Sequence, residues 1–163
     1  MYNVGDVVVY KKDVCKIKEI KKNYFFDHDY YIMHPIDDDS LTINVSVERS
    51  SDMRYVISKE EGEKLIAVIP SIEVIETNEN DIEYEYKKLL QEGSLENLVK
   101  VIKTTYLRDQ ERLSQNKKIG EKDDSYFQKV EKRLYQELSI SFQMSFDDTK
   151  QYVIDSVSEQ MVS

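Results

Sequence analysis

The sequence lacks tryptophan and is poor in the residues that build metal sites and disulfides, with one cysteine and two histidines in 163 residues. A single Cys15 excludes an internal disulfide, and together with His28 and His34 it cannot complete a zinc site without many carboxylates. No apolar run approaches the roughly 18 residues of a membrane span, and no basic and then apolar leader precedes MYNVGDVVVY. We therefore expect a soluble, cytoplasmic protein with no structural metal or cofactor.

Positive charge is also scarce, because the chain carries a formal net charge of −9. Residues 1–57 hold eight Lys and Arg against ten Asp and Glu, so a charge of −7 falls on residues 58–163. Proteins that coat nucleic acid need a surplus of Lys and Arg for phosphate contacts. Any nucleic-acid contact by this chain must therefore be local.

Motifs of catalysis are missing as well. There is no Gly-rich phosphate loop, and neither His28 nor His34 has a Ser or Cys partner in a recognisable nucleophile motif. The acidic clusters at residues 37–39 and 76–85 lie in polar stretches without metal-loop spacing, which is typical of solvated surfaces. We predict that the protein is not an enzyme.

The first third of the chain has the pattern of short β-strands. In LTINVSV, Leu41, Ile43, Val45 and Val47 alternate with Thr42, Asn44 and Ser46, as in a half-buried strand of an antiparallel sheet. The other predicted strands cover 7–10, 15–20, 30–34 and 53–57, with turns at 27–29 and 37–40. Five short strands within residues 1–57 predict a small SH3-like or Tudor-like barrel.

From Ser58 the period changes from two to 3.6 residues, which predicts an all-helical domain over residues 58–163 and an α+β chain overall. Ser58 and Glu61 form a capping box for a helix that ends before Pro70, and Ser145 with Asp148 forms another. Helices are also predicted from Asp81 to Gly93, from Ser94 to about Gln115, and where apolar residues step by four. These last residues are Tyr126, Val130, Leu134, Leu138 and Phe142.

The helix that begins at Ser94 is predicted to be the centre of the helical domain. Gly93 can adopt the left-handed conformation that ends the preceding helix, and the Ser94 hydroxyl can accept from the new first turn. Apolar residues recur at spacings of three and four and predict one buried stripe. They are Leu95, Leu98, Val99, Ile102 and Tyr106.

Several motifs together resemble the CarD/CdnL family of bacterial transcription regulators. They are VGDVVVY, a Cys-x-Ile-x-x-Ile strand, LTINVSV, the helical junction EGSLENLVKVIKTTYLRDQER and the later EKRLYQELSISF. The first segment is shared with the polymerase-binding module of transcription-repair coupling factors, whereas the helical motifs are specific to CarD-like proteins. The resemblance covers nearly the whole chain.

The resemblance implies that residues 1–57 form a Tudor-like domain that docks on the lobe of the RNA polymerase β subunit. An exposed strand edge can pair with a partner strand while the outward side chains provide specificity. Family members often carry Arg on the polymerase-facing strands where this chain has Asn23 and Asn44, so neutral amides replace charged contacts there. The residues that we expect at this interface are Lys21, Lys22, Asn23, Thr42, Asn44 and Ser46.

The resemblance also implies that the helical domain contacts promoter DNA, but the family's wedge tryptophan is missing. The corresponding stretch, 76–82, is acidic and would repel phosphate. We therefore expect any DNA contact, weak and dependent on polymerase, to involve Lys100, Lys103, Arg108, Arg112, Lys117 and Lys118. Two functions stay open: a regulator that modulates open-complex stability, and a polymerase-tethered interaction module whose helical domain recruits a protein instead of DNA.

Overall fold

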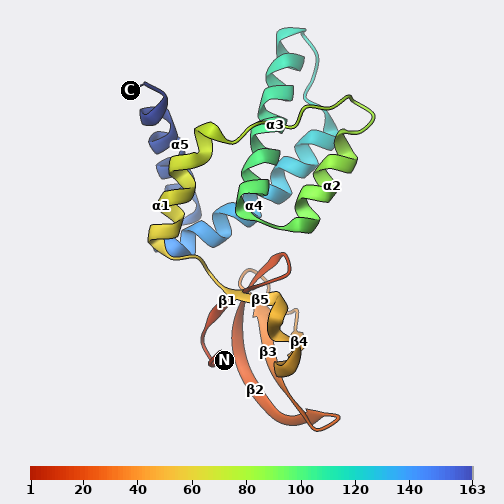
Figure 1. The fold of residues 1–163 in the computed structure, drawn as a ribbon, viewed down its shortest axis with the longest axis vertical. Coiled ribbons are helices and arrows are strands. Elements are labelled where there is room, and N and C mark those ends of the chain that lie inside the picture. Colours follow the sequence, from red (N-terminus) through yellow and green to blue (C-terminus); the bar gives the residue numbers. More distant parts are fainter. Residues whose placement is uncertain (163) are drawn as a thin grey trace. The chain divides into compact units, whose positions relative to one another are not determined.

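The computed structural model describes residues 1–162, with side chains through residue 160, and has an α+β fold (Figure 1). The chain divides into two compact units, Met1–Ile57 and Ser58–Ser163. The first contains the β-strands and the second contains the α-helices.

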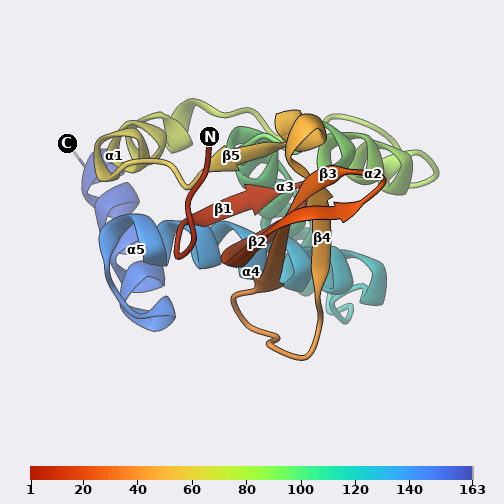
Figure 2. The same ribbon diagram turned by 90° about the horizontal axis from the view of Figure 1, so that it is seen from below.

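The first unit, the sheet unit, is one five-stranded antiparallel sheet in the order β4-β3-β2-β1-β5 (Figure 2). Strands β4 and β5 form its edges and are not paired with each other in the part of the chain described, so the sheet is open. A 3₁₀ segment, Val47–Asp52, connects these two strands. The strands are β1 (Val7–Tyr10), β2 (Asp13–Phe25), β3 (His28–Pro35), β4 (Ile43–Ser46) and β5 (Met53–Tyr55).

One face of the sheet carries the core of this unit. Tyr31 and Met33 of β3 are among its fully buried side chains, and the Tyr2 hydroxyl donates to the Met53 carbonyl at 2.9 Å. Burial, assisted by the charge of Asp13, raises the pKa of the Cys15 thiol to about 11. The buried residues of this core are Val8, Cys15, Ile17, Tyr31, Met33, Val45 and Met53.

Strand lengths differ from the pattern-based prediction, most of all in β2 and β4, while β3 is longer than 30–34 and β5 ends at Tyr55 rather than at residue 57. Strand β2 does not end near Ile20 but continues to Phe25, and the turn lies at Phe26 and Asp27 rather than over residues 27–29. Strand β4 is shorter than predicted, because Leu41 lies outside it with 50% of its surface exposed and Val47 begins the 3₁₀ segment. The alternation of apolar and polar residues in LTINVSV therefore extends beyond Ile43–Ser46, the residues that pair with β3.

The second unit, the helical unit, begins with the predicted capping box. The Ser58 hydroxyl accepts from the Glu61 N–H at 3.1 Å, and the Glu61 carboxylate accepts from the Ser58 N–H at 3.1 Å. A 3₁₀ turn, Ile69–Ser71, contains Pro70 and follows the first helix. The helices are α1 (Lys59–Val68), α2 (Ile82–Glu92), α3 (Leu95–Ser114), α4 (Glu121–Phe142) and α5 (Phe146–Val162).

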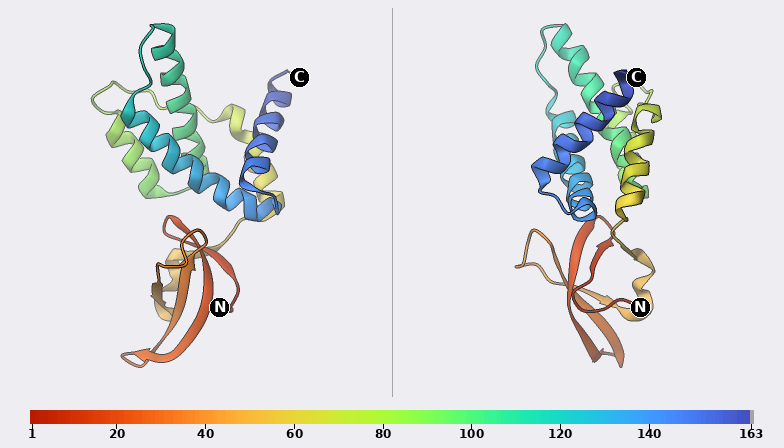
Figure 3. Two further views of the ribbon diagram at one scale, coloured as in Figure 1. Left: turned by 180° about the vertical axis from the view of Figure 1, so that it is seen from behind. Right: turned by 90° about the vertical axis from the view of Figure 1, so that its left-hand side faces the viewer.

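Helix α3 packs against α2 and α4, while α1 and α5 pack against the C-terminal half of α4 (Figure 3). The predicted α4 stripe is confirmed at Val130, Leu134, Leu138 and Phe142, which are buried, whereas Tyr126 at its start is only half-buried. The α2–α3 junction is confirmed as well: Gly93 has φ 76°, and the Ser94 hydroxyl accepts from the Asn97 N–H at 3.1 Å.

The predicted stripe of α3 is wrong at its C-terminal end. Tyr106 is 64% exposed, whereas Val101, Thr104 and Thr105 are buried beside Leu98 and Val99. In the first half of α3 the buried residues occupy a wider arc of the helix than the predicted stripe. The buried residues of α3 end at Thr105. No described helix is both long and apolar enough to cross a membrane.

Candidate interaction surfaces

The outer face of the sheet brings part of the predicted polymerase-binding set together. Lys21, Tyr30 and Ser46 are Cα partners across β2, β3 and β4, and residues directly opposite in a ladder point to the same face. Asn44 is exposed on that face, two pairs further along β4 and opposite Ile32. Strand β4 is an edge strand, so one row of its backbone N–H and C=O groups has no partner in the described sheet. Exposed Thr42 directly precedes it.

Lys22 and Asn23 lie next to this face, in a bulge of β2. The register shifts between Lys21 and Phe25, so three residues of β2 face Asp29 alone. The Asp29 carboxylate accepts from the Asn23 N–H at 3.0 Å and from Lys22 Nζ at 3.2 Å. The hydrogen bond from Asn23, followed by that from Lys22, lowers the pKa of Asp29 below its usual value. The bulge is thus fixed by one carboxylate.

The six basic residues of the predicted DNA contact do not form one face. Lys103 and Arg108 are five positions apart, which places them about 140° apart around α3. Lys103 Nζ donates to the carbonyls of Ile69 at 2.8 Å and Ile72 at 2.6 Å. Lys103 therefore holds the segment after α1 and is engaged inside the fold. Lys100, one turn before it, is half-buried.

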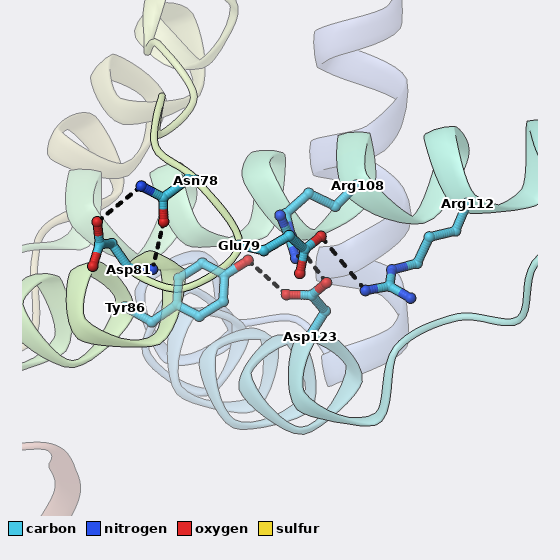
Figure 4. A network of polar contacts seen from close by, with 7 residues as sticks. All are labelled: Asn78, Glu79, Asp81, Tyr86, Arg108, Arg112 and Asp123. Atoms are coloured by element: carbon cyan, nitrogen blue, oxygen red, sulfur yellow. Dashed lines mark hydrogen bonds and ion pairs between the residues drawn. The ribbon is translucent and has the colours of Figure 1, made fainter.

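Arg108 and Arg112 lie together but are engaged with carboxylates (Figure 4). Arg108 Nε donates to Asp123 Oδ2 at 3.0 Å, and Arg108 Nη2 donates to Glu79 Oε1 at 3.1 Å. The guanidinium group of Arg112 lies 3.7 Å from the same Glu79 oxygen. The side chain of Arg108 is only 16% exposed. This Arg therefore has a structural role in the described fold.

Tyr86 completes a buried polar network that the sequence pattern did not indicate. Its hydroxyl donates to Asp123 Oδ1 at 2.9 Å, and neither side chain is appreciably exposed. Burial, followed by the hydrogen bond to Asp123, raises the pKa of Tyr86. Asp123 thus accepts from α2 and from α3 at its two oxygens and ties both helices to the start of α4. Glu79 belongs to the predicted acidic stretch. It joins the network at its exposed edge by pairing with Arg108.

Asp109 is an ionisable neighbour of this network with one unsatisfied carboxylate oxygen. Among the described side chains, its buried Oδ1 atom has no hydrogen-bond donor. Burial, followed by the charges of Asp123 and Asp124, raises the pKa of the Asp109 carboxyl. The site therefore stores unfavourable electrostatic energy at neutral pH.

Lys117 and Lys118 are the exposed members of the predicted DNA set, in the loop after α3. Lys117 borders a cleft of about 400 Å³ with both cations and carboxylates in its wall. Three basic groups face two acidic ones there, so the cleft offers little net attraction to phosphate. Its lining residues are Glu79, Arg108, Glu111, Arg112, Gln115 and Lys117.

Within the described residues, no group of three or more Cys, His, Asp or Glu side chains is arranged to hold a metal ion. No protein-family model matches the chain, and no curated protein matches its sequence significantly. The two candidate surfaces are therefore characterised by their own geometry. The sheet unit has a strand edge with polar outward side chains, and in the helical unit Arg108 and Arg112 are paired with carboxylates.

Proposed function

We propose that the protein is a transcription regulator of the CarD/CdnL type, which binds the lobe of the RNA polymerase β subunit through the sheet unit. The proposal assigns this unit to the SH3-like or Tudor-like class of small β modules. The observation that supports it best is the free edge of β4, where Ser46 stands in register with Lys21 and exposed Asn44 lies two residues before Ser46 on the same face. Such an edge can accept a partner strand by main-chain hydrogen bonds.

The Asn44 side chain tests this surface. Asn44→Asp adds a charge beside the edge and should weaken binding of the full chain to the core polymerase from its own organism. Asn80→Asp is the matched control, because Asn80 is also an exposed amide but lies in the helical unit. Biolayer interferometry would measure both affinities. Equal affinities of the two variants would contradict the proposed edge.

The proposed effect on transcription is a change in the lifetime of the open promoter complex. Lys117 and Lys118 could supply two phosphate contacts, with a salt slope of only about −2 at roughly −0.9 per contact. Docking on polymerase would compensate, since a tethered domain reaches an effective concentration on the order of millimolar. Lys117→Glu with Lys118→Glu should therefore abolish the lifetime effect without changing polymerase affinity.

A second function is favoured by the internal engagement of Lys103 and Arg108. With these cations unavailable and the wedge tryptophan absent, the helical unit would recruit another protein to polymerase and leave DNA untouched. The same lifetime assay separates the two functions. Polymerase binding by the wild-type chain with an unaltered open-complex lifetime would favour recruitment.

A further inference from the structure

The hairpin tip, defined here as residues Lys22–Asp29, extends beyond the rest of the sheet. Strand β4 pairs with β3 only from Tyr30 onward, and β1 pairs with β2 only at its beginning. The tip is therefore a two-stranded projection with no third strand beside it (Figure 3). At its base the tip contacts the rest of the sheet unit, because His28 Nδ1 lies 3.1 Å from Glu48 Oε1 of the 3₁₀ segment.

Three consecutive aromatic residues occupy this tip. Tyr24, Phe25 and Phe26 are 45%, 56% and 80% exposed. The rings of Phe25 and Phe26 pack edge to face with centroids 4.4 Å apart, and the Tyr24 ring packs on Tyr30 at 5.7 Å. An isolated exposed aromatic residue is ordinary, whereas a contiguous and mutually packed group marks an interaction site.

The backbone of the turn does not favour an aromatic residue. Phe26 and Asp27 are the two residues between the paired Phe25 and His28, and their φ angles are 50° and 60°. A two-residue turn with both φ angles positive favours Asn, Asp or Gly, and a bulky side chain is strained there. The Phe26 ring gains little burial in return. The strain is therefore not explained by the stability of the sheet unit and points to a contact outside it.

Charges at the tip identify the kind of partner. Lys22 is paired with Asp29 at 3.2 Å, and Lys21 Nζ lies 4.6 Å from the centre of the Tyr24 ring. With Asp27 also at the turn, the tip has no surplus of cations. Nucleic acid and anionic bilayers both require such a surplus. A convex, aromatic and electrically balanced tip instead fits an apolar pocket on a protein.

We propose that Phe25 and Phe26 form a paired anchor that inserts into an apolar pocket of the polymerase, next to the contact made by the β4 edge. The inference rests on the proposed function for the identity of the partner. Lys21, Lys22 and Asn23 connect the two surfaces in sequence, so one docking event engages both. Buried aromatic anchors of this kind dominate interface affinity, while the polar surroundings exclude water.

Phe26→Asn separates anchoring from folding, because Asn suits the positive φ angle while the ring is lost. We expect an unchanged or higher melting temperature, together with a Kd for core polymerase raised about 10- to 30-fold. Phe25→Thr removes the ring but places a β-branched residue, which favours strands, at this position, and it should raise Kd by a similar factor. Tyr106→Ser is the control, since Tyr106 is an aromatic residue of similar exposure on α3.

The possible results separate a failure of the anchor proposal from a failure of the proposed polymerase binding. No binding by the wild-type chain would overturn both proposals. Wild-type binding with unchanged affinities of both tip variants would overturn the anchor alone. Phe26→Trp gives the chain its sole tryptophan. The fluorescence of this residue therefore shows whether the tip binds a lipid bilayer or nucleic acid instead of a protein. A blue shift on phosphatidylglycerol vesicles, or quenching by single-stranded oligonucleotide, would also overturn the protein pocket, whereas no change supports it.

Discussion

Removal of the Tyr86 hydroxyl tests whether the network around Asp123 holds the helical unit together. Tyr86→Phe leaves Asp123 Oδ1 without its donor at 2.9 Å, while Arg108 Nε continues to donate to Oδ2. A hydrogen bond to a charged group contributes about 1.5–3 kcal/mol, so we expect a loss of about 2 kcal/mol in the free energy of unfolding. Asp123→Ala should cost more, about 3–5 kcal/mol, because it leaves the guanidinium of Arg108 without its buried partner.

Urea unfolding followed by circular dichroism at 222 nm measures this loss, since all five α-helices belong to the helical unit. Tyr84→Phe is the matched control on the same helix: Tyr84 is 67% exposed and should change stability by less than about 0.5 kcal/mol. The denaturant dependence should be equal in all variants, so that the midpoints report stability. A Tyr86→Phe variant as stable as Tyr84→Phe would refute the assigned contribution of the network.

The pH dependence of the same variant gives an independent check. The pKa of Tyr86 is raised in the folded state, so the unfolded chain loses this proton first, above the usual tyrosine pKa of about 10. The stabilisation is complete below that pH and is lost as pH rises above it. Wild-type stability should therefore fall more steeply than that of Tyr86→Phe, by up to about 1.4 kcal/mol per pH unit.

Two further substitutions concern Lys103, which the sequence predicted at a DNA contact, and Asp109, which has an unsatisfied carboxylate oxygen. Lys103→Met should lower the free energy of unfolding by about 1–2 kcal/mol, because the carbonyls of Ile69 and Ile72 lose a charged donor; Lys100→Met is the control, and equal effects would contradict the role. Asp109→Asn should raise the free energy of unfolding at pH 7 by less than about 1 kcal/mol, since it removes a repelled carboxylate that solvent partly screens. This gain should vanish in acid, where Asp109 is protonated, and a loss of stability at pH 7 would show that the carboxylate has a favourable partner.

Local signals predicted the helical boundaries well. The capping box of Ser58 and Glu61 and the junction of Gly93 and Ser94 are present as the sequence indicated. These features depend on hydrogen bonds and φ angles within four residues, so they are encoded where they occur. The α4 stripe was predictable for a similar reason, because a period sustained over five turns defines a face.

Tertiary cover was not predictable from the same pattern. Tyr106 shares the period of the α3 stripe, yet it is 64% exposed although the neighbouring Thr104 and Thr105 are buried. Periodicity states which residues share a face and says nothing about whether a neighbour reaches it. The engagement of Arg108 was hidden for a related reason: its partner Asp123 is 15 positions away, across a loop.

The turn between β2 and β3 was misplaced because its chemistry is unusual. The sequence around it contains no glycine, and the predicted turn was set by the polar residues 27–29. In the structure, Phe26 takes one of the two positive φ angles, and Asp29 moves into the strand to fix the bulge at Asn23. Residue preferences for turns predict those turns whose φ angles suit the residues present. They therefore do not predict a strained turn such as the one at Phe26 and Asp27.

The single thiol of Cys15 makes the opening of the sheet unit visible by itself. It is fully buried, and its pKa of about 11 leaves almost no thiolate at neutral pH. A disulfide reagent such as DTNB should therefore label the chain only when the sheet unit opens, with no background from other cysteines. Labelling rates then give the kinetics of one unit while circular dichroism follows the other. Because the chain has a single cysteine, the labelling rate reports the opening of the sheet unit separately from the unfolding of the helical unit.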